Sequence, residues 1–252
     1  TCISVDDHAY SHNIWLGNNA FQIDPQTGYS DDCSIGVAPK TYVPDDNFEA
    51  YLEARGMGDG IVSNDSVLTS IISMVTDLDV DYQSIADLTG IEDFAALSEL
   101  HCNSNQLTRL DVSQNTLLLE LECNHNQISG LDLENCTNIE LLKAEHNEIT
   151  YVYFGDSTEF SEIHLSNNKI DTLNLSSLNY MYAGKLFRLT DNLLTSLDLT
   201  NVIIRVLTCD SNQLTSIDLR NGYNTAVVEI NAYDNPNLTC ISVDDTAYSN
   251  AN

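Results

Sequence analysis

Positive charge is scarce in this 252-residue chain, and its scarcity excludes several classes of partner. Lys and Arg together number 9 against 38 Asp and Glu, which gives a formal net charge of -29. Binding to nucleic acid and attraction to anionic membrane surfaces both need clustered Lys and Arg. We therefore expect no nucleic-acid partner and a strongly negative surface. No run of about 18 apolar residues is present, so we also expect no direct insertion into a membrane.

Motifs that carry catalysis are missing as well. The sequence has no G-x-S-x-G, no H-E-x-x-H, no P-loop and no C-x-x-C, and these are the arrangements that position nucleophiles, metals or phosphates. We therefore expect a non-catalytic protein without a cofactor. The chain also starts without an initiator Met and without a basic, apolar leader. This start favours a processed or excised piece of a longer polypeptide.

An internal repeat dominates the rest of the sequence. Residues 97–112 and 118–133 both follow the pattern L-x-x-L-x-(C/L/A)-x-x-N-x-L, and the pattern continues to residue 238. Its asparagines stand 20 to 24 residues apart, at Asn105, Asn126, Asn147, Asn168, Asn192, Asn212 and Asn235. Alternating apolar residues before each asparagine predict a short strand with an inward-facing side. One unit cannot bury that side alone, so the units must stack. The sequence predicts an α/β repeat solenoid with one parallel strand per repeat and a mostly irregular convex side.

The repeat resembles that of leucine-rich-repeat proteins, and in particular the short-repeat surface proteins of the Bacteroidota. The resemblance rests on Y-V-P-D-D-N-F-E at residues 42–49, L-D-V-S-x-N-T at 110–116 and N-P-N-L-T-C-I at 235–241. It implies an exported, non-catalytic protein that is often part of a larger secreted polypeptide. It also implies that the first motif opens a repeat block and that the last begins its closing cap.

A long-range duplication sets the expected domain boundaries. Residues 1–11 recur almost unchanged as residues 239–249, an offset of 238. We expect residues 1–38 to be the closing cap of a preceding block, and tandem blocks in the parent protein. Residues 39–65 should form a helical N-terminal cap, with a helix over 44–56 that begins near Pro44 and ends at Gly56. Repeats follow over 66–238, and residues 239–252 begin the next closing cap.

The solvent side of the strands is the predicted binding surface. Counting the first apolar residue of each repeat as position 1 puts the key asparagine at position 9, and positions 3, 5, 7 and 8 should face solvent. Four of the six histidines and two of the few basic residues fall at positions 5 and 8. We expect Lys143, His146, His164 and Arg188 to cluster on neighbouring strands, ringed by acidic residues. Glu122, Glu145 or Glu162 should offset their repulsion. The candidate binding residues are His101, Glu122, His125, Lys143, His146, His164, Arg188 and Thr208.

Two candidate cation sites have a simpler structural interpretation. His125 and His146 lie one repeat apart, near Glu122 and Glu145, but two ladder histidines without a fixed third ligand favour an ordinary surface over a metal site. A column of aspartates at the L-D-(V/L) position was the other candidate, for Ca²⁺. We expect these aspartates to accept hydrogen bonds from turn amides of their own repeats. The column comprises Asp79, Asp111, Asp132, Asp198 and Asp218.

The seven cysteines fall into different environments. Cys102, Cys123 and Cys209 occupy position 6, where other repeats have Leu, and we expect them to be buried and reduced. The export that the resemblance implies would place Cys2 and Cys33 of the closing cap in an oxidising setting, so we expect them to be bonded. The same resemblance marks four short D-(S/T)-apolar matches as O-glycan acceptors: Ser66, Ser157, Thr172 and Thr246.

The sequence thus predicts an extracellular or cell-surface module that binds a protein or a glycan through its concave face. The alternative is a structural role, as a rigid spacer or accessory subunit within a larger surface assembly. The 238-residue duplication keeps this alternative open.

Overall fold

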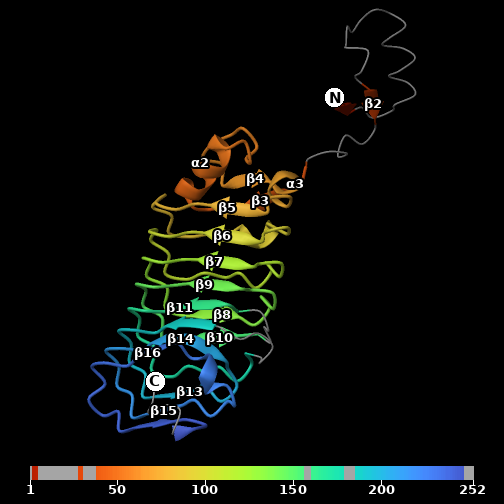
Figure 1. The fold of residues 1–252 in the computed structure, drawn as a ribbon. Helices are drawn as coiled ribbons and strands as arrows, with labels where there is room; N and C mark the ends of the chain where they lie inside the picture. The colour runs from red at the N-terminus through yellow and green to blue at the C-terminus, as the bar shows by residue number, and fades with distance from the viewer. Residues whose placement is uncertain (1, 5–27, 31–37, 156–159, 179–184, 247–252) are drawn as a thin grey trace, which may run out of the picture. The chain divides into compact units, whose positions relative to one another are not determined.

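A computed structural model describes residues 2–4, 28–30, 38–155, 160–178 and 185–246. The chain divides into two compact units, residues 1–39 and 40–252. In the first unit, β1 (Cys2–Ser4) and β2 (Gly28–Ser30) form a two-stranded parallel sheet. The second unit contains the other described elements and is the repeat solenoid (Figure 1).

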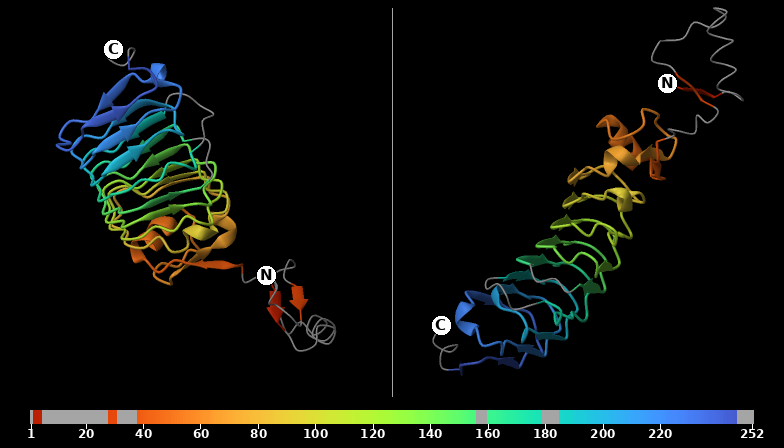
Figure 2. Two further views of the ribbon diagram at one scale, coloured as in Figure 1. Left: turned by 90° about the horizontal axis from the view of Figure 1, so that it is seen from below. Right: turned by 90° about the vertical axis from the view of Figure 1, so that its right-hand side faces the viewer.

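The concave side of the solenoid is one parallel sheet with the strand order β16-β14-β12-β11-β9-β7-β6-β5. Each repeat contributes one short strand, and the strands stack in register like rungs (Figures 1 and 2). This confirms the predicted fold class. The strands are β5 (Asp77–Asp79), β6 (Glu99–His101), β7 (Glu120–Glu122), β9 (Leu141–Lys143), β11 (Glu162–His164), β12 (Lys185–Arg188), β14 (Ile204–Thr208) and β16 (Glu229–Asn231).

The core lies directly behind this sheet and follows the predicted alternation. In β6, β7 and β9 the central residue is buried while its two neighbours are partly exposed. Leu100, Leu121 and Leu142 are these central residues, and all three are fully buried. Position 6 also faces inward, and Cys102, Cys123 and Cys209 are buried and unbonded there. The cysteines therefore serve as small apolar side chains.

Position 9 asparagines hold neighbouring turns together. The Nδ2 group of Asn126 donates to the Cys102 oxygen of the preceding repeat at 2.9 Å and to the Cys123 oxygen of its own at 3.1 Å. Its Oδ1 accepts the N–H of Leu107 at 3.0 Å. The same three contacts recur at Asn147 and later repeats. Each asparagine thus satisfies backbone groups that the turn would otherwise leave buried and unpaired.

Short strands also line part of the convex side. They are β8 (Leu131–Leu133), β10 (Val152–Phe154), β13 (Ser196–Asp198), β15 (Ser216–Asp218) and β17 (Cys240–Ser242). β10 pairs with β8, and the other three form the sheet β13-β15-β17. All of these pairings are parallel.

The aspartate column on this side has the predicted structural role. The side chains of Asp111, Asp132 and Asp198 each accept the backbone N–H two residues later, at 2.9–3.0 Å. Asp79 has the same role, since its Oδ1 accepts the N–H of Asp81 at 3.0 Å, but its assignment to the convex column is wrong. Asp79 pairs with His101 in the concave sheet, because the first repeat is irregular and its strand carries the same L-D-V letters.

A helical cap covers the first turn of the solenoid. The helix α2 spans Asp46–Ala54, slightly shorter than predicted, and Asp45 caps it by accepting the N–H groups of Asn47 and Phe48. Phe48 stacks on Phe94 at 6.3 Å between ring centroids. The cap also contains the antiparallel pair β3 (Lys40–Tyr42) and β4 (Ser66–Leu68), and α3 (Thr69–Ile72).

Two short 3₁₀ segments, Ile91–Asp93 and Asn224–Ala226, complete the described elements. None of the helices in the described ranges is long and apolar enough to cross a membrane.

Candidate binding face

Strand register brings three of the candidate residues together at the centre of the concave face. Lys143 of β9 lies opposite His164 of β11, and His164 lies opposite Arg188 of β12. Neighbouring strands lie about 4.8 Å apart, so the three position 5 side chains form one row. Thr208 of β14 continues this row beside Arg188. The fourth residue expected in this cluster, His146, lies beyond the strand and stacks on His125 instead.

Acidic neighbours balance the Lys143 side of the row. The Nζ atom of Lys143 lies 2.7 Å from Oε1 of Glu122, and both side chains are partly buried. Burial raises the pKa of Glu122, but the hydrogen bond and charge of Lys143, with a bond from Asn103, bring it below its usual value. Glu122 therefore stays ionised and neutralises Lys143.

His164 is the least exposed titratable group of the row, with 8% of the residue accessible. Its Nε2 lies 3.1 Å from Oε2 of Glu162 on its own strand. Burial lowers the pKa of His164; Glu145 opposes this shift and Arg188 adds to it. Arg188 is exposed and has no ion-pair partner among the described residues. Arg188 is thus the most available positive charge of this face.

Apolar side chains flank the cationic row. Position 3 holds Leu141, Leu186 and Val206, each partly exposed on the same side of the sheet as the row, with the carboxylate of Glu162 between Leu141 and Leu186. The centre of the face therefore combines charge with aliphatic surface, which is a composition that protein interfaces share.

The first strands of the face have the opposite charge. Positions 3 and 5 of β5, β6 and β7 hold Asp77, Asp79, Glu99, His101, Glu120 and Glu122. One possible ligand atom from each of Asp77, Glu99 and His101 lies within 4.8 Å of the other two. Nδ1 of His101 is 3.9 Å from Oε2 of Glu122. The concave face is thus acidic at its first strands, whereas Lys143 and Arg188 lie at its centre together with Glu162.

The two position 8 histidines have a backbone explanation that the sequence prediction missed. His125 and His146 both have φ 56°, and every other position 8 residue from Tyr82 to Asp234 also lies between 51° and 60°. Asn, Asp and His tolerate this left-handed conformation better than most residues, and they fill five of the eight positions. The two imidazole rings stack at 4.4 Å and 9°. This stack turns the ring faces, not the ring nitrogens, toward each other.

Position 7 also differs from the expectation that it simply faces solvent. Oδ1 of Asp81 accepts the N–H of Asn103 at 2.6 Å, Oδ1 of Asn103 accepts that of Asn124 at 2.8 Å, and Oδ1 of Asn124 accepts that of Glu145 at 2.7 Å. These side chains form a second ladder beside the position 9 asparagines. The run of Asp and Asn at position 7 is the signal that would have revealed it.

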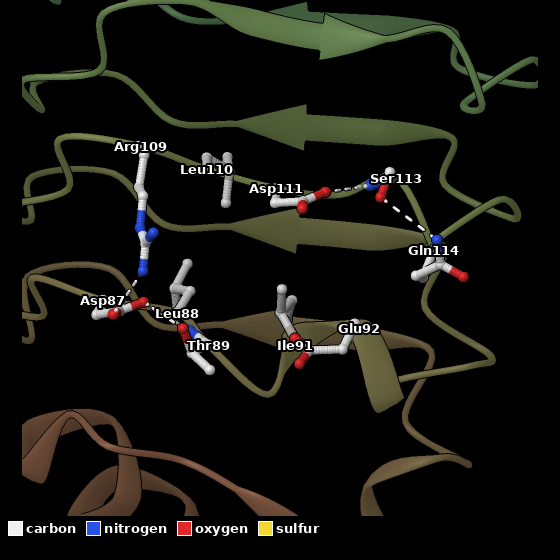
Figure 3. A pocket seen from close by; sticks show the side chains of 10 residues that line it. All are labelled: Asp87, Leu88, Thr89, Ile91, Glu92, Arg109, Leu110, Asp111, Ser113 and Gln114. Carbon is white, nitrogen blue, oxygen red and sulfur yellow. Dashed lines mark hydrogen bonds and ion pairs between the residues drawn. The ribbon is translucent and has the colours of Figure 1, made fainter.

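A pocket of about 400 Å³ lies on the convex side, away from the row of candidate residues. Leu88, Ile91 and Leu110 line it together with several polar side chains (Figure 3). Its carboxylates already have local partners: Asp87 contacts Arg109 at 3.1 Å, and Asp111 accepts the N–H of Ser113. Because these groups are engaged, the pocket offers a ligand few free polar atoms.

The remaining predicted sites are only partly placed. Thr172 and Thr246 are exposed, whereas Ser66 is partly buried in β4, where its Oγ bonds to Asn64. Ser157 lies outside the described residues, as does Cys33, so the bond expected between Cys33 and Cys2 stays a prediction. Cys240 is exposed and unbonded.

Comparison with known proteins supports the repeat fold. No family model matches the chain. A stretch of 75 residues, 30% of the chain, is 39% identical to internalin J of Listeria monocytogenes, and it covers 8% of that protein.

Among solved structures, a leucine-rich-repeat protein of Leptospira interrogans is similar with a TM-score of 0.56 and 18% identity, over 66% of this chain and 44% of that one. The functional domain of internalin J, described as including a cysteine ladder, aligns with a TM-score of 0.42 and 22% identity, over 81% of this chain and 64% of that one.

These findings support a leucine-rich-repeat fold with repeats of about 21 residues. The similarity to the Leptospira protein concerns the fold alone. The specific resemblance to Bacteroidota proteins stays a prediction.

Proposed function

We propose that this chain is a non-catalytic extracellular binding module that recognises a protein or a glycan through the centre of its concave face. The row of Lys143, His164 and Arg188 carries the proposal, together with the partly exposed aliphatic side chains beside it. The row brings together two cationic side chains, Lys143 and Arg188, in a chain that has only 9 Lys and Arg in all. The partial sequence similarity to internalin J agrees with a role in binding at a cell surface.

The charge pattern indicates which partner would fit. An anionic group gains from Arg188, which has no acidic partner among the described residues. It is repelled by the carboxylates of β5 to β7 and by Glu162 of β11, so it should dock on the β12 side of the row. We therefore propose a partner that presents carboxylates, such as a uronic-acid glycan or an acidic protein loop, and that contacts β9, β11 and β12. Exposed charge contacts of this kind weaken as salt rises.

An array of carboxylated and neutral oligosaccharides, with acidic peptides included, tests this proposal. The test compares the natural chain with a variant in which Lys143, His164 and Arg188 are all replaced by Ser. A matched control replaces the exposed cations Lys169 and Arg220, which lie outside the concave sheet. We expect carboxylated probes to bind the natural chain and the control but not the triple variant. Equal binding by all three proteins would place recognition elsewhere.

The 238-residue duplication favours a second candidate function, that of a rigid spacer in a tandem surface protein. A spacer needs the stacked core but no particular concave side chain. Under this alternative, no probe on the array binds the natural chain, and the triple variant assembles into the surface protein as well as the natural chain does.

A further inference from the structure

Three carboxylates meet beside the helix of the N-terminal cap. Asp46 and Glu49 lie one turn apart on α2, and Asp65 ends the loop that leads from this helix to β4. One carboxylate oxygen from each residue lies within 4.8 Å of the other two. Asp46 and Asp65 are exposed, whereas Glu49 is only 1% exposed. The cluster therefore holds one buried carboxylate against two exposed ones.

The buried carboxylate is only half satisfied by the protein. Oε1 of Glu49 accepts the N–H of Asn64 at 3.0 Å, but Oε2 is buried and has no hydrogen-bond partner among the described residues. Burying a carboxylate is costly unless its charge is paired and its oxygens are bonded. Asp46 and Asp65 bring further negative charge to it. A cation held among the three side chains would satisfy Oε2 and offset their mutual repulsion.

The positive groups of the cap itself are engaged elsewhere. Lys40 and Arg55 are the two basic residues of the cap. Nζ of Lys40 lies 2.5 Å from Oδ2 of Asp59, and the Arg55 guanidinium lies over the Tyr51 ring, 3.6 Å from its centroid. The N–H groups at the start of α2 donate to Asp45. Within the described ranges, no ion pair includes a carboxylate of the cluster.

From these observations we propose that Asp46, Glu49 and Asp65 bind one Ca²⁺ ion. Ca²⁺ takes oxygen ligands at about 2.3–2.6 Å, so two oxygens on one ion lie at most about 5.2 Å apart. The oxygens of the cluster meet that limit. Zn²⁺ sites are built mainly from nitrogen and sulfur ligands, and Mg²⁺ usually binds one or two carboxylates and keeps several waters. Three carboxylates therefore favour Ca²⁺.

The ion would join α2 to the segment that returns from it. The backbone oxygen of Asp65 already accepts the N–H of Val43, just before the helix, at 2.9 Å. A Ca²⁺ ion shared by Glu49 and Asp65 adds a second connection, between the helix and the start of β4. Because Phe48 of the same helix stacks on Phe94, the ion would also hold the cap against the first repeats. This site is separate from the concave face.

Calorimetric titration and thermal unfolding of the full chain, first freed of metal with a chelator, test the proposal. Extracellular modules bind Ca²⁺ with dissociation constants of about 10⁻⁴–10⁻³ M, so the titration extends to about 10 mM. Moderate salt and a parallel titration with Mg²⁺ control for weak attraction of any divalent cation to the acidic surface. We expect Ca²⁺ at ten times its dissociation constant to raise the melting temperature by about 3–6 °C, and Mg²⁺ to raise it much less.

Two variants locate the ion. Glu49→Gln keeps the size of the side chain but removes its charge, so in chelator it should be at least as stable as the natural chain. With Ca²⁺ it should bind one ion fewer and gain no stability. Asp46→Asn combined with Asp65→Asn changes only exposed side chains and should give the same loss of binding. Asn also tolerates the φ of 54° at residue 65.

A second carboxylate cluster supplies the matched control. Asp77 and Glu99 lie equally close together, beside His101 on the concave face. Asp77→Asn combined with Glu99→Gln changes the net charge as much as the double cap variant does, and it should bind Ca²⁺ like the natural chain. A natural chain that neither binds nor is stabilised by Ca²⁺ would overturn the proposal, as would cap variants that bind as many ions as the natural chain. Loss of binding in the control variant alone would place the ion on the concave face and overturn it too.

Discussion

Replacing Asn126 with Ala should remove one rung of the asparagine ladder and destabilise the solenoid strongly. The side chain makes hydrogen bonds of 2.9, 3.0 and 3.1 Å to three buried backbone groups. At about 1 kcal/mol net for each of the three bonds, and about 1–3 kcal/mol more for a buried amide left without a partner, the loss is about 4–6 kcal/mol. Ala has no polar side-chain atom and cannot replace any of these contacts.

The matched control is Asn138→Ala. Asn138 is exposed, and its Nδ2 makes one bond to the Thr116 oxygen at 3.2 Å, so the change should cost less than about 1 kcal/mol. Urea denaturation followed by circular dichroism gives both free energies of unfolding. Hydrogen exchange should show faster exchange at Leu107, whose N–H loses its acceptor. If Asn126→Ala costs no more than Asn138→Ala, the ladder does not stabilise the stack as described.

Three further predictions concern individual positions. The three buried strand cysteines, Cys102, Cys123 and Cys209, should resist alkylation until the protein unfolds, because burial raises their pKa and excludes the reagent. Cys240 is exposed and should react at once. Fast labelling of any of the three strand thiols in the folded protein, located by mass spectrometry, would contradict this. Burial lowers the pKa of His164, so the unfolded chain binds the proton more tightly, and the free energy of unfolding should fall as pH drops below about 6.5. His164→Gln should flatten this dependence of the unfolding free energy on pH, and an unchanged dependence would refute the assignment. Ser211 has φ 54°, a conformation that a β-branched residue adopts poorly. Ser211→Val should therefore lower the stability measured by thermal unfolding by about 1–2 kcal/mol, while Ser211→Gly should not destabilise the protein. Equal effects of the two changes would argue against the left-handed turn.

The sequence pattern predicted the repeat because each repeat position has one physical role throughout the stack. Apolar residues at positions 4 and 6 must face inward, and a residue that bonds two turns at once must be Asn at position 9. Because this pattern recurs in seven repeats, the position of each residue within its repeat is unambiguous. The cap was predictable for a similar reason, since Phe48, Tyr51 and Leu52 form one apolar stripe on a short helix, and all three are buried.

Where one sequence motif fits more than one structural position, the sequence alone did not identify the correct position. Asp79 was assigned to the convex column because the irregular first repeat offers the same three letters in a concave strand. The conformation of position 8 was missed because this position holds no single residue type: Tyr82, Ser104 and Ser211 share it with the His, Asn and Asp residues that favour a positive φ. The candidate binding row was only partly predictable. The pattern placed Lys143, His164 and Arg188 on one face with acidic residues around them, but it did not show which carboxylate pairs with Lys143; the structure identifies Glu122.

The dissociation constant for an oligogalacturonate, measured at low and high salt, tests the role of the concave face most directly. The measurement compares the natural chain with two double variants. The concave variant carries Lys143→Ser and Arg188→Ser, and the control variant carries Lys169→Ser and Arg220→Ser. Both variants change the net charge by the same amount. We expect the concave variant to bind at least about tenfold more weakly, equivalent to about 1.4 kcal/mol, and to lose most of its salt dependence, while the control matches the natural chain. Equal weakening in the two double variants would mean that net charge, and not the concave row, governs binding.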